Sequence, residues 1–448
     1  MTASSVVIQS CQVLQIPADA GPGRVLADQD IHLSGGRIVA IVGAGSRPVD
    51  PGAQIVDAGG RLAVPGLINA HSHLPMVLMR GVGEDMGIEE WFNDVVWPME
   101  MNLTPDRVWA GARLACAEML LGGVTAVADH YFMTDRIAAA AVELGIRANL
   151  APTYFTSEGP EARRAAVAAA IAVRDAGSPL LTASLGPHAT YTVDEDDLRW
   201  FADAAVAEGM PIHIHTSETI EQTAASQAKL GVTPIEVLAR TGVLAAGTLI
   251  AHGTGIVPSD LPILAGFRDR VGVASCPKGY FKVAMATMTP VRGLTEHGIR
   301  IGVGTDGAAS GNTLDILEQT RLLALSQKQQ ERDPRFLTVT DALRMATRGG
   351  ASLAPFGTTG ALEEGAAADV VLIDLSGPHC QPVHDPLATL LYSARASDVH
   401  TVIVNGDIVV DDRRLVNADL DEIVRAAAAV APELLTRRPG EAVQYYAP

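Results

Sequence analysis

The chain has 448 residues, of which 48% are hydrophobic, 19% charged and 4% aromatic. Its formal charge is −18 at pH 7, and such an acidic surface disfavours nucleic acid and anionic membranes as partners. The length suits two or three domains or one decorated α/β barrel, and the apolar fraction provides for a large core. These properties favour a soluble enzyme that acts on a small molecule, but the simpler interpretation, which we prefer, is that an acidic surface keeps the protein soluble.

Cysteine usage and the N-terminus indicate the compartment. The four cysteines are scattered without CxxC spacing, which predicts neither a disulfide framework nor a zinc ribbon. Met1 to Ser10 contain no basic region and no signal-cleavage pattern. The alanine-rich stretches Ile137–Val142 and Ala165–Val173 are too short to span a bilayer. We therefore expect a cytoplasmic protein.

The first part of the chain predicts short strands that are separated by glycine and aspartate turns. Gly35-Gly36 fits a tight hairpin turn. Gly43-Ala44-Gly45 lacks the third glycine of a dinucleotide-binding motif, so we do not predict one. The predicted strands are Ser5–Ile16, Asp30–Leu33, Arg37–Val42 and Gln54–Asp57.

From Ala63 onward, strands alternate with helical segments. Eight such repeats predict parallel βα units, most simply a closed (β/α)₈ TIM barrel over residues 63–360. The predicted strands are Ala63–Asn69, Val124–Asp129, Arg147–Thr153, Leu181–Gly186, Pro211–His215, Thr248–His252, Val271–Ser275 and Ile299–Gly304. The clearest helices are Pro105–Leu121, Pro160–Asp175, Asp194–Glu208 and Thr233–Arg240.

After Gly360 the pattern returns to strands. Val370–Asp374 is followed by Val402–Val404, and Asn405-Gly406 predicts a type I′ hairpin before Ile408–Val410. Strands at both chain ends predict one small composite β-sandwich domain, formed from residues 1–62 and from residues 361–448 with the C-terminal tail.

Histidines cluster where the predicted barrel strands end. Alternation along a strand places residues i and i+2 on one face, so His71 and His73 can chelate one ion. His213 and His215 form a second pair, and His252 ends another strand. Asp306, in Gly304-Thr305-Asp306-Gly307, ends the last strand. Because functional residues of such barrels lie at the carboxyl ends of strands, these residues predict a mononuclear metal site.

Catalytic zinc takes nitrogen and oxygen ligands and keeps one position open. We predict the ligands His71, His73, His215 and Asp306 for one Zn²⁺ per chain, with Fe²⁺ or Mn²⁺ as alternatives. His213 is interpreted as a packed histidine beside the ligands. A two-metal site would need a bridging lysine at the end of the fourth strand, where the chain has His188.

Two further residues predict the chemistry. Glu218 follows the His215 strand, where its carboxyl can reach both substrate and metal-bound water, although a loop glutamate is usually just solvated. His252, which could also be a core histidine, is predicted to orient or deprotonate that water together with Asp306. A bound metal lowers the pKa of its water, and Glu218 can protonate a ring nitrogen. This chemistry suits deamination, dehalogenation or cyclic amide hydrolysis equally.

The chain resembles the amidohydrolase superfamily, in the branch of 5-methylthioadenosine/S-adenosylhomocysteine deaminases and s-triazine hydrolases. The resemblance covers nearly the whole chain. The family implies a barrel with a composite β-sandwich, usually zinc, and often a homo-oligomer (dimer or tetramer). The motifs that carry it are Pro65 to His73, His215-Thr216-Ser217-Glu218, His252, Gly304 to Ser310, Leu362-Glu363-Glu364-Gly365 with Ala368-Asp369, and Val404-Asn405-Gly406.

The resemblance also implies substrate contacts. It places Trp91 near the substrate, Glu100 on ribose hydroxyls and His188 on the nucleoside, whereas a core tryptophan, a capping glutamate and a structural histidine are the alternatives. One segment departs from the family pattern. Gly279-Tyr280 with an extra Lys278 replaces the usual polar pair in a loop that should border the pocket and could reshape ring recognition. Arg163 and Arg164 are candidates for gripping an amino-acid carboxylate, or are merely surface residues of a helix.

Three functional hypotheses follow. The first is a zinc-dependent deaminase of an aminopurine nucleoside such as 5-methylthioadenosine, S-adenosylhomocysteine or adenosine. The second keeps the metal chemistry on another N-heterocycle, such as a pterin, an oxidised guanine or an s-triazine. The third is a non-catalytic scaffold, which the presence of every predicted ligand and of Glu218 disfavours.

Overall fold

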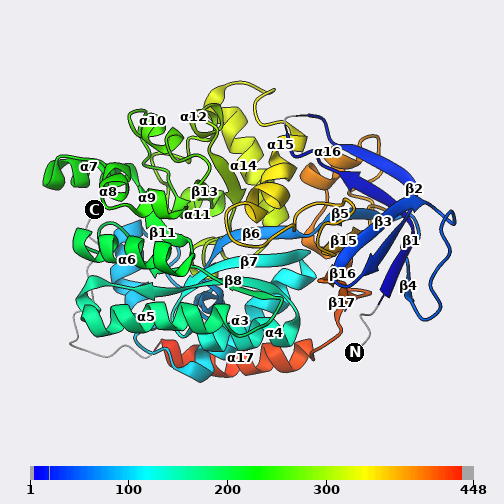
Figure 1. The fold of residues 1–448 in the computed structure, drawn as a ribbon, viewed down its shortest axis with the longest axis horizontal. Coiled ribbons are helices and arrows are strands. Elements are labelled where there is room, and N and C mark those ends of the chain that lie inside the picture. Colours follow the sequence, from blue (N-terminus) through cyan, green and yellow to red (C-terminus); the bar gives the residue numbers. More distant parts are fainter. Residues whose placement is uncertain (1–4, 20, 436–448) are drawn as a thin grey trace.

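The computed structural model describes residues 5–19 and 21–435 and has an α/β architecture with parallel sheets (Figure 1). Strands from both ends of the chain form one nine-stranded sheet, in the order β18-β17-β16-β15-β5-β1-β2-β3 with β4 beside β1. These strands are β1 (Ser5–Gln15), β2 (Arg24–Ser34), β3 (Arg37–Gly43), β4 (Gln54–Asp57), β5 (Leu62–Pro65), β15 (Val370–Ile373), β16 (Val399–Val404), β17 (Asp407–Asp411) and β18 (Arg414–Leu415).

Both predicted hairpins are confirmed in this terminal sheet. Gly35 and Gly36 have φ of 59° and 73° between β2 and β3. Asn405 and Gly406 have φ of 53° and 85° between β16 and β17. Positive φ at both central residues is the type I′ geometry, which matches the twist of the flanking strands. Buried aliphatic side chains of the two chain ends share one core in this sheet, among them Ile8, Val13, Ile31, Leu372 and Ile403.

The remaining strands form two parallel sheets that carry the functional residues. One has the order β10-β8-β7-β6 with β9 beside β8, and the other has the order β11-β12-β13-β14. All of their pairings are parallel, as predicted. They are β6 (Leu67–Ser72), β7 (Val124–Tyr131), β8 (Arg147–Tyr154), β9 (Leu181–Ala183), β10 (Gly186–Pro187), β11 (Ile212–Thr216), β12 (Thr248–His252), β13 (Val271–Ser275) and β14 (Arg300–Val303).

One predicted strand is divided. Ala63–Asn69 is split at Gly66: β5 pairs with β1 and β15 in the terminal sheet, whereas β6 pairs with β7. Pro65 has no N–H to donate, which favours a break at this point. A Cβ at Gly66 would lie 1.9 Å from Thr125 Oγ1, so only glycine lets the chain pass here. The chain therefore crosses between the two kinds of sheet within three residues.

Helices cover the parallel sheets (Figure 1). Thr104 and Asp194 cap α3 and α6 by accepting hydrogen bonds from N–H groups three residues on, and the helix predicted for Pro105–Leu121 is confirmed. The C-terminal helix α17 packs against α3, where Arg113 pairs with Glu422. The helices are η1 (Leu74–Met79), α1 (Ile88–Glu90), η2 (Trp91–Val96), α2 (Trp97–Glu100), α3 (Pro105–Leu121), α4 (Thr134–Leu144), η3 (Thr156–Glu158), α5 (Gly159–Arg174), α6 (Glu195–Glu208), α7 (Ile220–Leu230), α8 (Pro234–Arg240), α9 (Val243–Ala246), α10 (Asp260–Ala265), α11 (Pro277–Lys282), α12 (Val291–Glu296), α13 (Ala308–Gly311), α14 (Ile316–Glu331), α15 (Val339–Arg344), η4 (Met345–Gly349), α16 (Pro386–Tyr392), η5 (Ala396–Asp398) and α17 (Leu420–Leu434).

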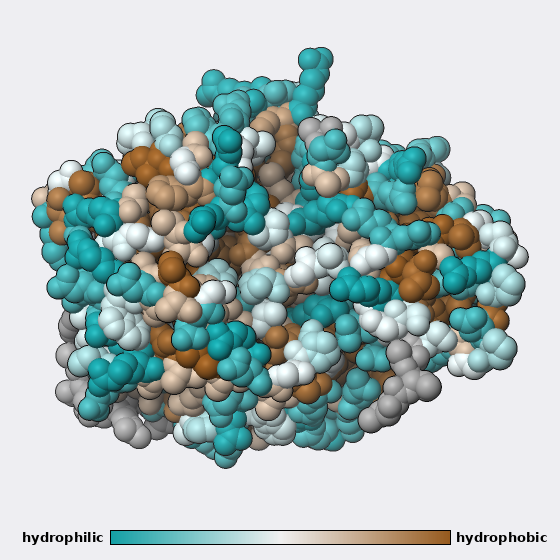
Figure 2. All heavy atoms as spheres, viewed as in Figure 1, coloured by the Kyte–Doolittle hydropathy of each residue, from teal (hydrophilic) through white to brown (hydrophobic). Residues whose placement is uncertain are grey.

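The surface mixes polar and apolar residues. On the face drawn in Figure 2, hydrophobic side chains lie in separate patches between hydrophilic ones. Within residues 5–19 and 21–435, every helix is too short or too polar to traverse a bilayer. Of the N-terminal segment Met1 to Ser10, residues 1–4 lie outside the described part of the chain. Residues 436–448 of the C-terminal tail also lie outside it.

Candidate metal centre and substrate pocket

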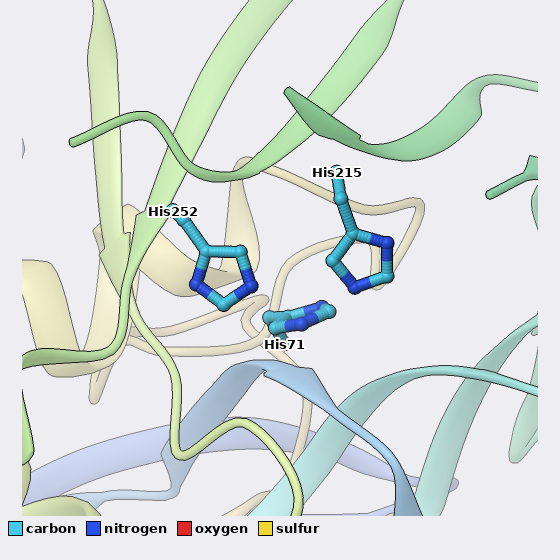
Figure 3. A group of neighbouring side chains, drawn as sticks. All are labelled: His71, His215 and His252. Carbon is cyan, nitrogen blue, oxygen red and sulfur yellow. The ribbon is translucent and has the colours of Figure 1, made fainter. Parts of the chain in front are cut away.

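Histidines from three strands converge at the carboxyl ends of the parallel sheets. His71 on β6, His215 on β11 and His252 on β12 are buried and point toward one another (Figure 3). The ring centroid of His71 lies 4.9 Å from that of His215 and 5.0 Å from that of His252. His73, one residue after β6, stacks on His215 at 5.2 Å between centroids. The pattern of residues i and i+2 at strand ends thus brings these rings together.

Hydrogen bonds fix how the rings of this cluster are oriented. His73 Nδ1 lies 2.6 Å from the carbonyl oxygen of His130, and His215 Nδ1 lies 2.9 Å from that of His188. Because a carbonyl only accepts, both Nδ1 atoms carry the proton, and in the neutral rings both Nε2 lone pairs are left facing the cluster. The two Nε2 atoms lie 3.3 Å apart. Two lone pairs at this distance require a proton or a cation between them.

His71 is held differently. Its Nδ1 lies 2.9 Å from Nε2 of His213, which lies on the same strand as His215. The buried Nε2 of His71 has no hydrogen-bond partner among the described residues. An unsatisfied buried nitrogen beside two inward-facing lone pairs is the donor arrangement that a metal ion satisfies. His213 therefore orients a ring of the cluster.

Asp306 completes the cluster from the loop after β14. Its Oδ1 lies 3.2 Å from His73 Nε2 and 3.6 Å from His71 Nε2, and its Oδ2 accepts a hydrogen bond from Ser310 Oγ. His252 and Asp306 have positive φ values of 73° and 58°. This conformation costs a non-glycine residue about 1 kcal/mol or more, and such strain gathers at functional sites. The backbone is strained where these side chains are aimed inward.

The electrostatics show that the cluster attracts positive charge. Burial lowers the pKa of His73, but the hydrogen bond and charge of Asp306 outweigh it and raise the pKa to about 9. Burial raises the pKa of Asp306, but the neighbouring His71 and His73 rings bring it well below its usual range. Burial lowers the pKa of His71 to about 3. The Asp306 carboxylate therefore holds one proton on His73 while His71 stays neutral, and a divalent ion can take the place of that proton.

A carboxyl lies next to this cluster. Glu218 is buried, and its Oε1 lies 3.9 Å from His252 Nε2. Its Oε2 accepts hydrogen bonds from Tyr191 Oη at 3.1 Å and Gln222 Nε2 at 3.3 Å, and Gln222 Oε1 accepts from the Glu218 N–H. These contacts hold the carboxyl between the histidines and the pocket, in a position from which it can exchange a proton with a bound molecule.

The opposite side of the pocket is aromatic. Trp97 contacts Phe92 and Phe155, with ring centroids 5.2 Å apart in both pairs. Phe155 lies 4.5 Å from His188 and 6.1 Å from Phe132 between centroids. Rings at these separations and tilts pack favourably. This aromatic wall, which we define as Trp91, Phe92, Trp97, Phe132 and Phe155, can cover a flat ring or an apolar substituent.

Glu100 lies between the aromatic wall and the cluster. Part of its side chain faces the pocket. Desolvation by the surrounding protein raises the pKa of the Glu100 carboxyl to about 7 and outweighs the opposing effects of Tyr131 and of the charge of His73. Near neutral pH this carboxyl therefore exists in both forms and can donate or accept a hydrogen bond. Hydroxyl groups of a ligand can satisfy either form.

The structure brings the predicted site residues together. His71 lies beneath the pocket floor, and the other predicted residues line a single pocket. They are His73, Trp91, Glu100, His188, His215, Glu218, His252 and Asp306.

Some pocket residues were not predicted. His130 and Tyr131 end β7 and line the pocket, one and two residues beyond the predicted strand Val124–Asp129. The strand-end rule that points to His71 could have found them. Phe92, Phe155 and Tyr191 come from segments with no comparable pattern.

One expectation is wrong. The Gly279-Tyr280 segment is not a loop that borders the pocket but part of α11. Tyr280 is buried behind His252, its hydroxyl accepts a hydrogen bond from the Cys276 N–H, and it does not line the pocket. Lys278 is turned away as well, because its ammonium binds Glu318 at 2.7 Å. The helix therefore places the Tyr280 ring behind His252, with its hydroxyl 3.5 Å from His252 Nδ1, and turns the Lys278 charge away from the pocket.

The candidate arginines also lie elsewhere. The Arg163 guanidinium pairs with Asp197 and stacks over the Trp200 ring at 4.5 Å. Arg164 is exposed on α5. Neither residue lines the pocket, so they are surface and structural residues of this helix.

A separate group of potential ligands contains His379, Cys380 and Asp398. Its contacts are satisfied without an ion, since Asp398 Oδ2 accepts hydrogen bonds from His379 Nε2 at 2.7 Å and from the Arg395 N–H at 2.8 Å. Burial raises the pKa of the Cys380 thiol, which disfavours the thiolate that a metal needs. This group is explained as a cap of η5.

Comparison with known proteins identifies the class. The chain matches the amidohydrolase family over residues 62–409 and belongs to it. It is 38% identical to a 5-methylthioadenosine/S-adenosylhomocysteine deaminase from Pelotomaculum thermopropionicum over 97% of this chain and 100% of the relative.

Solved structures agree with this assignment. An adenosine deaminase from Xanthomonas campestris with bound zinc superimposes with a TM-score of 0.90 at 32% identity, over 97% of this chain and 99% of the other. An atrazine chlorohydrolase from Arthrobacter aurescens complexed with zinc has a TM-score of 0.86 at 28% identity, over 95% and 100% of the two chains. The resemblance seen in the sequence motifs is confirmed.

Proposed function

We propose that this protein is a zinc-dependent hydrolase that deaminates an aminopurine nucleoside and releases ammonia. One observation carries the proposal: the histidine–aspartate cluster, the Glu218 carboxyl and the aromatic wall all face the same pocket. The deaminases named among the relatives and solved structures support the nucleoside substrate. The solved deaminase with bound zinc supports the metal.

His71, His73, His215 and Asp306 would hold one zinc ion. Their inward-facing nitrogens and the lowered pKa of Asp306 fit it. When bound, zinc supplies the Lewis acidity that makes water a stronger nucleophile at neutral pH.

The protein groups around the cluster move the protons. His252 together with Asp306 accepts the proton of the attacking water while the C–O bond forms. Glu218 gives a proton to the ring nitrogen beside the attacked carbon, as its position against Tyr191 and Gln222 allows. The added hydroxyl then returns its proton to Glu218 as it becomes a carbonyl, and the amino group takes the proton held by His252 and departs as ammonia when the C–N bond breaks. The two protons delivered to the substrate therefore equal the two taken from the water.

Three residues would bind the nucleoside. His188 lies against Phe155 and Tyr191 at the end of β10, within reach of the heterocycle. Trp91 contributes a ring to the pocket wall, and Glu100 offers a carboxyl that can both donate to and accept from ribose hydroxyls. These roles rest on the family resemblance together with their common placement in the pocket.

Fold and assembly form a further part of the proposal. We propose that the two parallel sheets close into one (β/α)₈ barrel over residues 63–360, with a composite β-sandwich formed from residues 1–62 and 361–448. Backbone contacts support closure on both sides: Leu185 bridges to Ile212, and the Asp306 N–H donates to the His71 carbonyl. Family resemblance supports a homo-oligomer in the cytoplasm.

Hydrolysis of another N-heterocycle, such as a pterin, an oxidised guanine or an s-triazine, is the second candidate. It is favoured by the similarity to the atrazine chlorohydrolase. Ammonia release by zinc-loaded protein should be compared across methylthioadenosine, adenosine, guanine-type bases, pterins and amino-triazines. Turnover of a purine nucleoside at least about tenfold above the other rings, a difference of about 1.4 kcal/mol, would support the proposal. Turnover of the other rings alone would refute it.

A further inference from the structure

The pocket is lined mainly by acids, imidazoles and aromatic rings, and its protonated imidazole, His73, is paired with Asp306. Among residues 5–19 and 21–435, no lysine or arginine lines it. Three carboxyl groups do, from Glu100, Glu218 and Asp306. The class of relatives to which the chain is similar acts, by name, on two nucleosides with different 5′ tails. Both are 5′ thioethers, but one tail ends in a methyl group and the other in an amino acid with an ammonium and a free carboxylate.

Cations on the segments that flank the pocket are paired with carboxylates. Arg80 pairs with Glu118, and Arg136, four residues beyond the wall residue Phe132, lies 3.6 Å from Asp135. Arg163, eight residues beyond the wall residue Phe155, is paired with Asp197. On α11, Lys278 pairs with Glu318, and Lys282 pairs with Glu84. A cation that is already paired with a carboxylate loses that interaction if it turns to a ligand, so none of them is poised to bind a substrate carboxylate.

Two cavities adjoin the pocket. One shares Tyr191 with it and contains Arg199 and Lys229 beside the acids Asp194, Glu195 and Asp196. The other lies along the aromatic wall and is unfavourable to an anion. This groove shares Phe132 and Thr153 with the pocket and is lined mainly by alanines of α4 and α5. The charged side chains that line this groove are the acids Asp135 and Glu158. A substrate tail that extends along the aromatic wall therefore meets rings, methyl groups and negative charge.

From this charge pattern we propose that the pocket selects nucleosides whose 5′ substituent carries no carboxylate, with methylthioadenosine favoured over S-adenosylhomocysteine. The inference rests on the proposed function. The 5′ sulfur, which both nucleosides share, fits the aromatic wall, because sulfur packs well against ring edges. A carboxylate beside the same rings would be desolvated without a partner, and an unpaired buried charge is costly. Charge, rather than size, would then decide the preference.

The test compares three 5′ substituents on the wild-type enzyme: methylthio, butylthio and the homocysteine group. The butylthio analogue has a tail of similar length with no charge. We expect kcat/KM for the butylthio compound to stay within a few-fold of that for methylthioadenosine, and kcat/KM for S-adenosylhomocysteine to fall by about tenfold or more. An equal loss for the butylthio compound would show that length decides, and would overturn the proposal.

A variant adds a gain-of-function test. Phe132 is half-buried at the junction of pocket and groove, so an arginine there can reach the tail and keep contact with water. Phe132→Arg should raise the ratio of S-adenosylhomocysteine to methylthioadenosine turnover about tenfold, and less at high salt. Phe132→Met, of similar size without charge, is the matched control and should leave the ratio unchanged.

The outcomes separate the two proposals. Comparable or faster turnover of S-adenosylhomocysteine by the wild-type protein would overturn the charge selection and leave the deaminase proposal standing. Release of ammonia from none of the nucleosides would refute the deaminase proposal, and the inference would fall with it. If Phe132→Arg does not fold, the wild-type comparison of the three tails decides alone.

Discussion

The two sides of the pocket are built by different forces. On the histidine–aspartate side, hydrogen bonds to fixed partners aim each side chain, as the His130 and His188 carbonyls aim His73 and His215. On the aromatic side, rings such as Trp97 and Phe155 are held by mutual packing at centroid distances near 5 Å. The first side is buried polar structure, and the second is an extension of the hydrophobic core.

This difference has consequences for mutation. Directional contacts around a shared centre depend on one another, because removing one member leaves the others unsatisfied. Packed rings contribute separately, since each loses only its own contact area. We therefore expect losses on the histidine–aspartate side to be nearly complete, and losses on the aromatic side to be graded.

The largest effect should come from Asp306→Asn. Asparagine tolerates the positive φ at this position but lacks the charge that holds a cation. Zinc content and activity should fall together, by more than the roughly 100-fold that is lost when a hydrogen-bond partner of a metal ligand is removed. Metal analysis of the purified variant, alongside kcat/KM, checks this.

Asp260→Asn is the matched control for Asp306→Asn. Asp260, in α10, is also buried, but its carboxylate accepts a hydrogen bond from Thr233 Oγ1. It should keep both zinc and activity. A zinc-loaded, fully active Asp306→Asn enzyme would show that the ligand assignment is wrong and would remove the contrast between the two sides.

The next largest effect is expected for Glu218→Gln. Glutamine keeps the shape and some of the contacts with Tyr191 and Gln222 but cannot exchange a proton. We expect kcat to fall by about 10²- to 10⁴-fold, the usual contribution of a general acid, with zinc content unchanged. Steady-state kinetics and metal analysis measure the two quantities separately.

Glu236→Gln serves as its control, since Glu236 occupies the N3 position of the α8 capping box, where glutamine can replace glutamate. It should retain wild-type kcat. An unchanged rate in Glu218→Gln would assign proton transfer to another group.

On the aromatic side, Trp97→Leu should have a smaller effect. Trp97 loses ring contacts with Phe92 and Phe155 while leucine still fills part of the space. Aromatic pairs contribute about 0.5–1.5 kcal/mol beyond buried area, which predicts a rise in KM of roughly 2- to 12-fold with kcat little changed. Trp200→Leu, outside the pocket where Arg163 stacks, should leave KM unchanged. A collapse of kcat in Trp97→Leu would contradict the graded behaviour of this side.

The two sides also differ in how far the sequence predicts them. The cluster was predictable because strand alternation and strand ends are local features, and His71, His73, His215 and Asp306 each follow an apolar run. The aromatic wall was not, since Phe92 and Phe155 meet only when segments far apart in the chain fold together. Trp91 and Glu100 were found by family resemblance rather than by pattern.

The same reasoning applies to the fold. Strand alternation and the Gly35-Gly36 and Asn405-Gly406 turns predicted the strands and hairpins, because these depend on neighbouring residues. The division at Gly66 depends on the close approach of Thr125 from β7, which no local pattern reveals. The orientation of Lys278 and Tyr280 likewise follows from the packing of α11, and the sequence alone pointed them to the pocket.

The smallest effect on activity, but a distinct one on stability, is expected for Asp129→Asn. Asp129 supports the histidine–aspartate side: its Oδ1 accepts the Leu74 N–H next to His73, and its buried Oδ2 has no partner among the described residues. Burial raises its pKa to about 7, against an ordinary value of 3.8. The folded state therefore holds a proton that the unfolded state loses between these pH values. Stability should fall as pH rises through this window, by at most about 1.4 kcal/mol per pH unit.

Asparagine cannot titrate but can still accept a hydrogen bond from the Leu74 N–H. The stability of Asp129→Asn relative to the wild type should therefore rise from about pH 4 to pH 7 and stay constant above pH 7. Chemical denaturation of chelator-treated protein measures this, because a cation at His73 would itself lower the pKa of Asp129. The stability of Asp374→Asn relative to the wild type should change with pH in the opposite sense. Hydrogen bonds from Ser376 lower the pKa of Asp374, so its carboxylate stabilises the fold at neutral pH, and that contribution is lost in acid. Parallel pH profiles for Asp129→Asn and the wild type would mean that Asp129 is charged in the folded protein. The histidine–aspartate side would then contain a second negative charge that can hold a cation. Loss of the Asp306 charge alone would remove less of the zinc than the expected near-complete loss.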